Sequence, residues 1–227
     1  MFLDHFATVF LPHNNTASLI LRTFGRTVAP IMCYFIVQGY FSTSNLKRYT
    51  KRLLIFAAIS HLPYNLAFGY TFFQATSVIW PLAMGLIALT AIKRDDLHIL
   101  VKLVILGLCC AVSITANWNF VAVLWIVAFG LFHGNFAKQT VAFCVVGIVF
   151  HLALTFHRFG IFHEVFPQWH QFGIFLAIPL LAMYNGKLGK KSKAITWTFY
   201  IFYPAHLLLL FLLNRFTSLE AILQGLF

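Results

Sequence analysis

The sequence has few charged residues. Only 9% of its 227 residues are Asp, Glu, Lys or Arg, and five of them are acidic. A water-soluble domain has about 25% charged and about 45–50% apolar residues, whereas 61% of this chain is hydrophobic. The scarcity of charge excludes an ordinary soluble domain and indicates a protein whose surface faces an apolar solvent.

Motifs for nucleotide hydrolysis and for ordinary esterase chemistry are missing. The chain contains no Walker loop, no G-x-S-x-G and no G-x-G-x-x-G, which are the usual signatures of those activities. It also lacks H-E-x-x-H or similar ligand spacing, so we expect no metal site. The cysteines have no C-x-x-C spacing and lie inside apolar runs, where small buried hydrophobic residues are expected. They are Cys33, Cys109, Cys110 and Cys144.

Apolar runs close to the length of a membrane-spanning helix recur along the whole chain. Such runs are the signature of transmembrane helices, whereas the strands of a membrane barrel would alternate in polarity over about ten residues. The sequence therefore predicts an all-α integral membrane protein, a bundle of about nine transmembrane helices in one domain over residues 1–227. The predicted spans cover residues 1–12, 27–42, 53–68, 77–92, 99–115, 119–135, 140–156, 169–184 and 195–213.

Most basic residues lie in short segments between the apolar runs. They follow the second, fourth, sixth and eighth predicted spans, which is the pattern of the positive-inside rule, so we place these segments in the cytoplasm. Topology then explains the net charge of +11, and nucleic-acid binding is not expected. The segments predicted to face the opposite side are 13–26, 69–76, 116–118 and 157–168.

The first predicted span, residues 1–12, is too short to cross a bilayer. A helix of this length rises about 18 Å, while the hydrocarbon core is roughly 30 Å thick. The helix is either half-inserted or completed by about 10 residues upstream, and we favour the second interpretation.

Ionisable residues inside apolar segments are candidates for chemistry, because each costs about 2.5–3.5 kcal/mol or more at mid-depth unless it faces a cavity or a partner. Asp4 next to His5 suggests a general base, although adjacent helical residues point about 100° apart. An ion pair of Asp4 with Arg22 or Arg26 is the alternative interpretation. Arg22 and Arg26 share a helix face and can clamp an anion or an oxyanion, or else anchor at the interface. Pro30 is expected to kink the span near them.

Further polar residues lie within later spans. His61 precedes Pro63 in mid-span, and it is either a site residue or a hydrogen-bonded core histidine. Tyr203 and His206 lie on one stripe of the last span, among residues that are nearly all apolar. His151 has no second polar residue beside it in the sequence, and we rank it lower.

Four segments resemble the motifs of TraX-family membrane proteins, in order and spread along the chain. The first resembles an Asp-His…Phe-Pro signature, the second the family's long core block, and the last two its closing motifs. They are Asp4-His5 with Leu11-Pro12, residues 22–68, residues 184–187 (YNGK) and residues 199–209 (FYIFYPAHLLL). The chain departs from the family at 115–123, where an acidic, Gly-containing turn is common, and at His61-Leu62-Pro63, where an acidic residue is common before the proline.

The resemblance implies an activity as well as a fold. The namesake of the TraX family is associated with acetylating the amino terminus of a conjugative pilin, and the wider group resembles acyltransferase-3 type membrane acyltransferases. A multi-pass protein of the bacterial inner membrane is therefore implied. It would move an acetyl group from cytoplasmic acetyl-CoA, its co-substrate, to an extracytoplasmic acceptor, either a pilin amino terminus or an envelope glycan.

Such a transfer assigns roles to the residues singled out above. His5, oriented by Asp4, is the expected base, and Arg22 or Arg26 is the expected oxyanion stabiliser. The other expected residues of the catalytic site are His61, Tyr203 and His206. Side chains on the cytoplasmic side are expected to bind the CoA phosphates, and these are Arg48, Arg52, Asn185 and Lys187.

Two other functions stay open. A transporter for a small anion would use the arginines as its binding site, but the two halves of the chain show no convincing repeat of the kind that transporters usually have. A non-enzymatic assembly factor for a surface structure would keep the same polar residues without transferring an acyl group.

Overall fold

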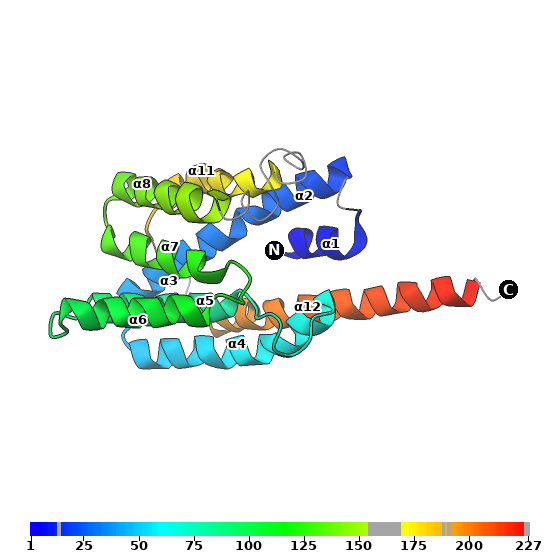
Figure 1. The fold of residues 1–227 in the computed structure, drawn as a ribbon, viewed down its shortest axis with the longest axis horizontal. Coiled ribbons are helices and arrows are strands. Elements are labelled where there is room, and N and C mark those ends of the chain that lie inside the picture. Colours follow the sequence, from blue (N-terminus) through cyan, green and yellow to red (C-terminus); the bar gives the residue numbers. More distant parts are fainter. Residues whose placement is uncertain (13–14, 154–168, 188, 190–191, 225–227) are drawn as a thin grey trace.

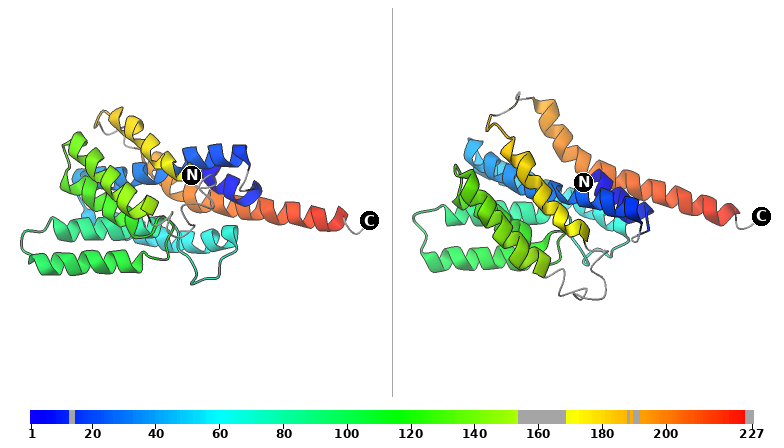
Figure 2. Two further views of the ribbon diagram at one scale, coloured as in Figure 1. Left: turned by 45° about the horizontal axis from the view of Figure 1, so that its top comes forward. Right: turned by 90° about the horizontal axis from the view of Figure 1, so that it is seen from above.

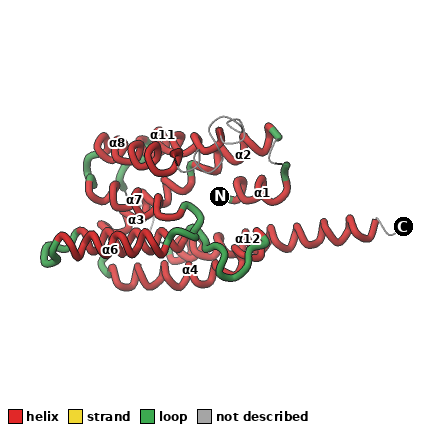
Figure 3. Tube along the Cα trace, in the orientation of Figure 1, coloured by secondary structure: helices red, strands yellow, loops and turns green. Residues whose placement is uncertain are grey.

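A computed structural model of the protein describes residues 1–12, 15–153, 169–187, 189 and 192–224, and these form a bundle of helices (Figure 1). No strand occurs among the described residues (Figure 3), where the one isolated β-bridge joins Thr76 to Ala116. The predicted all-α class is therefore confirmed for this part of the chain. The whole predicted outer segment 157–168, with its two histidines, lies outside the described residues.

Twelve helical segments follow one another within the described residues. Their bounds are α1 Phe2–Phe10, α2 Thr16–Arg26, α3 Val28–Ser42, α4 Leu46–Phe68, α5 Ile79–Ile92, α6 Ile99–Val112, α7 Asn119–Leu131, α8 Phe136–Val146, a π-helix η1 Gly147–Leu152, a 3-10 helix η2 Trp169–Leu176, α11 Ala177–Ala182 and α12 Lys193–Gln224. Each predicted span from 53–68 onward overlaps one of these helices or a consecutive pair of them.

The segment 13–26 lies outside the predicted spans, yet most of it is helical, as the expectation that Arg22 and Arg26 share a helix face requires. Asn15 caps α2, its side-chain oxygen accepting a hydrogen bond from the Ala17 amide at 2.9 Å. Thr27 keeps a right-handed helical backbone (φ −61°, ψ −28°), so α2 runs on into α3. Together they form Thr16–Ser42, 27 residues long, and among the described residues this is the one helix both long and apolar enough to cross a membrane.

Pro30 explains why the long helix is interrupted near its middle. Proline has no amide hydrogen, so the carbonyl of Arg26, four residues earlier, loses its helical partner. Thr27 is the boundary between α2 and α3, and its hydroxyl donates a hydrogen bond to the Phe24 carbonyl at 2.7 Å. The interruption that the sequence predicts near the arginines is thus observed next to Arg26.

The connections divide between the two ends of the bundle. The turns after α3, α5, α7 and α11 lie at one end in Figure 1, and the turns before α5 and α7 lie toward the other. The first group contains most of the basic segments recognised in the sequence. Two other views show α1 beside α12, and α1 packs against both α2 and α12 (Figure 2).

Three neighbouring helices, α5, α6 and α7, are short. They have 14, 14 and 13 residues and rise only about 20 Å each. The loops in front of α5 and α7 are joined by hydrogen bonds from Thr76 to Thr115 (3.2 Å) and from Asn117 to Thr76 (2.9 Å). These joined loops lie partway along the bundle, beside α1 and the middle of Thr16–Ser42 (Figure 1).

Candidate functional site

The polar residues gather where α1, α2, α12 and the turn before α7 meet. This place is fixed by packing, because α1 contacts both α2 and α12. Four polar side chains of the cluster are largely removed from solvent, with whole-residue exposures of 3–7% for three of them and a side-chain exposure of 13% for Arg26. These are Asp4, His5, Arg26 and His206.

His5 and His206 form a direct hydrogen bond across 201 positions of sequence. His5 Nδ1 lies 3.0 Å from His206 Nε2, and the two rings are nearly parallel, with planes 7° apart. The other nitrogen of His206, Nδ1, donates to the Phe202 carbonyl at 2.8 Å. Two imidazoles and a backbone carbonyl are thereby connected in one line.

Asp4 points to α2 rather than to His5. Its Oδ1 lies 3.8 Å from an amino nitrogen of Arg26, which is an ionic contact too long for a hydrogen bond. His5 makes its hydrogen bond to His206, so the expectation that Asp4 orients His5 is wrong in this structure. The cause is helical geometry, since neighbouring residues project about 100° apart.

Gly25 lets α1 approach α2 closely enough for the Asp4–Arg26 pair to form. A Cβ atom at position 25 would lie 2.3 Å from Asp4 Cβ and 3.1 Å from Asp4 Cα. No carbon atoms come that close in a folded protein without moving the backbone. The site therefore requires a residue without a side chain at this position of α2.

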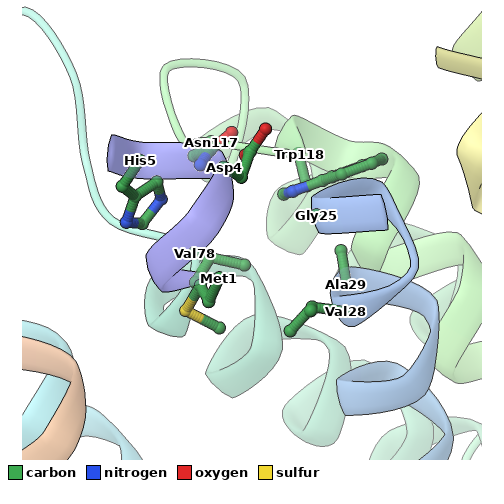
Figure 4. Close-up of a pocket in the computed structure, with 9 residues that line it drawn as sticks. All are labelled: Met1, Asp4, His5, Gly25, Val28, Ala29, Val78, Asn117 and Trp118. Atoms are coloured by element: carbon green, nitrogen blue, oxygen red, sulfur yellow. The ribbon is translucent and has the colours of Figure 1, made fainter. Parts of the chain in front are cut away.

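A small cavity opens beside the pair (Figure 4). Its volume of about 10 Å³ is at the lower limit of the space that one water molecule needs. It is lined by Met1, Asp4, His5, Gly25, Val28, Ala29, Val78, Asn117 and Trp118. In this conformation it can hold one small polar group, and a larger substrate requires the surrounding helices to separate.

Trp118 belongs to the site, although no sequence pattern selects it. The Arg26 guanidinium lies 5.2 Å from the centre of its ring, within the range of a cation–π interaction. Trp118 also stacks on His151 with ring centres 4.8 Å apart, and His151 hydrogen-bonds Gln171 at 3.0 Å. Asp4, Arg26, Trp118, His151 and Gln171 thus form a continuous series of contacts.

The backbone conformation at Trp118, which the sequence does not reveal, also marks this turn as unusual. Its φ of 68° and the φ of 34° at Asn119 are left-handed, a conformation that costs non-glycine residues about 1 kcal/mol or more and concentrates at functional sites. His151 lies in the π-helix η1, another feature frequent at functional sites. The segment 115–123 drew attention only because it departs from the TraX pattern.

Arg22 and Tyr203 are also in the cluster. Arg22 lies close enough to Arg26 and Asp4 to interact electrostatically with both. Its Nε is buried and has no hydrogen-bond partner among the described residues. The Tyr203 ring lies 5.3 Å from His206 and 6.3 Å from His5, and its buried hydroxyl lies beside the Ser77 side chain and the Val78 backbone. Six of the seven predicted catalytic-site residues therefore come together.

His61 is the seventh, and the structure places it apart. Its Nε2 lies 2.7 Å from the Phe72 carbonyl and its ring packs against the Phe72 ring at 4.5 Å. The side chain of Asn65, one turn along α4, completes this contact at 3.2 Å. Among the described residues, His61 joins α4 to the loop that follows it and makes no contact with the cluster. It is hydrogen-bonded, as the core-histidine interpretation requires, but it is only partly buried.

The four residues predicted to bind CoA lie at the other end of the bundle, on two separate elements. Arg48 and Arg52 are in the first two turns of α4, and the Arg52 guanidinium lies 6.0 Å from the Tyr200 ring. Asn185 and Lys187 follow α11, where the Asn185 side chain accepts from the Lys187 amide at 3.0 Å. No described contact joins the two groups.

Comparison with known proteins gives the chain a family context. A family model described as "TraX protein" matches residues 1–214. The chain is also 27% identical over 219 residues to the "Probable fimbrial assembly protein FimC, serogroup H1" of Dichelobacter nodosus, a match that covers 92% of this chain and 89% of the relative. No solved structure matches.

Proposed function

The chain belongs to the TraX family, and from this premise we propose that it is a multi-pass protein of the bacterial inner membrane that acetylates an extracytoplasmic acceptor during the assembly or modification of a pilus. The buried His5–His206 hydrogen bond beside the Asp4–Arg26 pair carries the proposal. A histidine held next to an ion pair and a cavity is suited to taking a proton from a nucleophile.

Exposed apolar side chains support the placement in a membrane. α6 exposes a nearly continuous set of them, and this surface would be unfavourable in water. The 27-residue helix Thr16–Ser42 is long enough to span the bilayer, and the basic turns at one end suit the cytoplasmic side. The exposed residues of α6 are Ile99, Leu100, Val101, Leu103, Val104, Leu108 and Val112.

The proposed reaction is the transfer of an acetyl group from acetyl-CoA. The amine or hydroxyl of the acceptor attacks the thioester carbonyl, a C–N or C–O bond forms, and the C–S bond breaks. His5 takes the proton of the nucleophile and returns it to the departing thiolate, so free CoA thiol leaves. The Arg26 or the Arg22 guanidinium stabilises the negative charge that develops on the carbonyl oxygen.

The two substrates would reach the cluster by different routes. Arg26 lies 16 residues before Ser42, so about 24 Å of helix separate the cluster from the basic end where CoA is proposed to bind. Fully buried side chains such as Val37, Leu86 and Trp125 fill this part of the bundle. The acceptor would therefore enter from the nearer, extracytoplasmic end, and the donor would require the core to open.

The proposal is tested by acetyl transfer in reconstituted vesicles. Protein is supplied with radiolabelled acetyl-CoA on the cytoplasmic side and with envelope fractions or purified pilin on the other. We expect label to reach the acceptor with wild-type protein and with the His133→Ala control, whose histidine stacks on Phe41 at the basic end. With His5→Ala the rate should fall by about 100-fold or more.

The name of the Dichelobacter relative favours a second candidate, an assembly factor that transfers no acyl group. This candidate is supported if wild-type protein neither transfers label nor hydrolyses acetyl-CoA, while deletion of the gene still lowers the number of assembled pili. The assembly-factor candidate is contradicted if pili assemble in normal number with His5→Ala and only their acetylation disappears.

A further inference from the structure

We infer that His206 is a positioning residue that holds His5 in the tautomer with its proton on Nδ1, which leaves His5 Nε2 as the basic nitrogen of the site. The inference deepens the proposed function, on which its catalytic meaning rests. The tautomer itself follows from hydrogen-bond geometry, and it is measured without any turnover.

The Phe202 carbonyl fixes the position of one proton on His206. A backbone carbonyl can only accept, so the 2.8 Å contact between His206 Nδ1 and the Phe202 oxygen places a proton on His206 Nδ1. In a neutral imidazole the other nitrogen is then an acceptor. His206 Nε2 therefore presents a lone pair to whatever lies in front of it.

The group in front of it is His5. A hydrogen bond between two nitrogens needs one donor, so the 3.0 Å contact requires His5 Nδ1 to carry the proton. The rings are 7° from parallel and their centres are 5.3 Å apart. That separation exceeds the nitrogen–nitrogen distance by about one ring diameter, so the two imidazoles meet edge to edge, with the donor aimed at the lone pair.

The second nitrogen of His5 remains free. Among the described residues His5 Nε2 has no hydrogen-bond partner, and Asp4 is occupied by Arg26 at 3.8 Å. The His5 ring is instead flanked by the edges or faces of Phe68 and Tyr203, at 5.2 and 6.3 Å. His5 also lines the cavity. A nucleophile that enters the cavity would therefore meet a histidine whose Nε2 is unprotonated.

The arrangement resembles the relay of hydrolases but uses a neutral orienting group. When His5 accepts a proton on Nε2, its Nδ1–H still faces the lone pair of His206, and the hydrogen bond strengthens because its donor is now charged. The reverse polarity would turn the His206 Nδ1 lone pair toward the Phe202 carbonyl, placing two acceptors 2.8 Å apart. The Phe202 carbonyl thus sets the direction of both hydrogen bonds, from His206 to Phe202 and from His5 to His206.

The direct test is nitrogen NMR of the full chain in lipid nanodiscs, with all histidines labelled with ¹⁵N. The His5 signals are identified by their loss in His5→Asn. At neutral pH we expect His5 to show a protonated Nδ1 and an unprotonated Nε2. A proton on Nε2, or on both nitrogens, would overturn the inference, and neither result depends on acetyl transfer.

Variants of His206 connect the tautomer to turnover. His206→Gln places an amide oxygen where Nε2 lies and can still accept from His5 Nδ1, whereas His206→Leu cannot. In the acetyl-transfer assay we expect kcat to fall at least about tenfold with His206→Leu and to recover in large part with His206→Gln, while the KM for acetyl-CoA stays within about twofold. Leu209→Ala, an exposed position on the same helix, is the matched control. Equal losses in the Gln and Leu variants would reduce His206 to packing, and a wild-type NMR result still decides the tautomer if either variant fails to fold.

Discussion

At the scale of single residues, the site depends on two charges placed where water is scarce. The side chains of Arg26 and Asp4 are only 13% and 10% exposed. Removing one partner of such a pair leaves the other charge desolvated and uncompensated, which costs more than the intact pair contributes. Here Arg22 lies near enough to Asp4 to offset part of that cost.

Arg26→Met is therefore expected to destabilise the protein by about 2 kcal/mol, below the roughly 3–5 kcal/mol typical of a pair with no third charge. The double variant Asp4→Asn with Arg26→Met should regain more than half of the loss, since neither side chain is then charged. Denaturant unfolding in detergent micelles, arranged as a double-mutant cycle, measures both quantities.

An exposed ion pair provides the control for this cycle. Arg94 forms hydrogen bonds to Asp96 with side chains 56% and 62% exposed, and surface pairs contribute little to stability. Arg94→Met should leave the unfolding midpoint unchanged. If it lowered the midpoint as much as Arg26→Met does, burial would not be the cause of the effect.

The sequence predicted which residues form the cluster and offered the Asp4–Arg26 ion pair as an alternative, which the structure confirms. It did not predict the hydrogen bond between His5 and His206. Asp4, His5, Arg26 and His206 were selected because an ionisable group in an apolar run needs a partner. The partners themselves depend on which helices become neighbours, and this is a tertiary property. Trp118 was missed because nothing in its residue type distinguishes a tryptophan stacked on arginine from one at the membrane interface.

At the scale of helices, the position of α1 is set by its contact with α2. Asp4 sits directly over Gly25, so the first helix brings both Asp4 and His5 to the cluster through one close approach. A displacement of α1 would separate Asp4 from Arg26 and His5 from His206 together. The two halves of the site are thus coupled through one glycine.

Gly25→Ala tests this coupling. Its added methyl group would lie 2.3 Å from Asp4 Cβ, so α1 must shift, with an expected cost of about 1–3 kcal/mol. Hydrogen exchange should become faster across Phe2–Phe10, and acetyl transfer should fall with it. Gly107→Ala on α6 is the matched control, because nothing lies within 4 Å of its added Cβ. That variant should be neutral or stabilising by up to about 1 kcal/mol, and unchanged exchange of α1 in Gly25→Ala would argue against the coupling.

The helices themselves were largely predictable, with one exception of clear origin. The apolar runs in the sequence predict the positions of α3 to α12, because a helix that is apolar along its length appears in the sequence as such a run. The segment 13–26 falls outside the predicted spans because it contains polar residues and two arginines, so only the shared face of Arg22 and Arg26 indicated a helix there. Its helix is stabilised by the Asn15 cap and by burial of Ser18 and Gly25 against neighbours, and the second of these contributions appears only in the packed bundle.

At the scale of the whole molecule, the two ends of the bundle differ in chemistry. One end gathers the basic turns, and the other holds the joined loops of Thr76 and Ala116 near the polar cluster. If the protein spans the inner membrane as proposed, Ser44 after α3 faces the cytoplasm, and Phe73 after α4, 88% exposed, faces the opposite side.

Ser44→Cys and Phe73→Cys, each in a variant whose four native cysteines are serine, test this orientation with a membrane-impermeant maleimide. In cells with a permeabilised outer membrane we expect label on position 73 and not on position 44, and in inverted inner-membrane vesicles the reverse. The physical reason is that α4 carries the chain from one end of the bundle to the other between these positions. Labelling of both positions from one side would place α4 along the membrane rather than across it, and an acceptor site facing outward would then have no support.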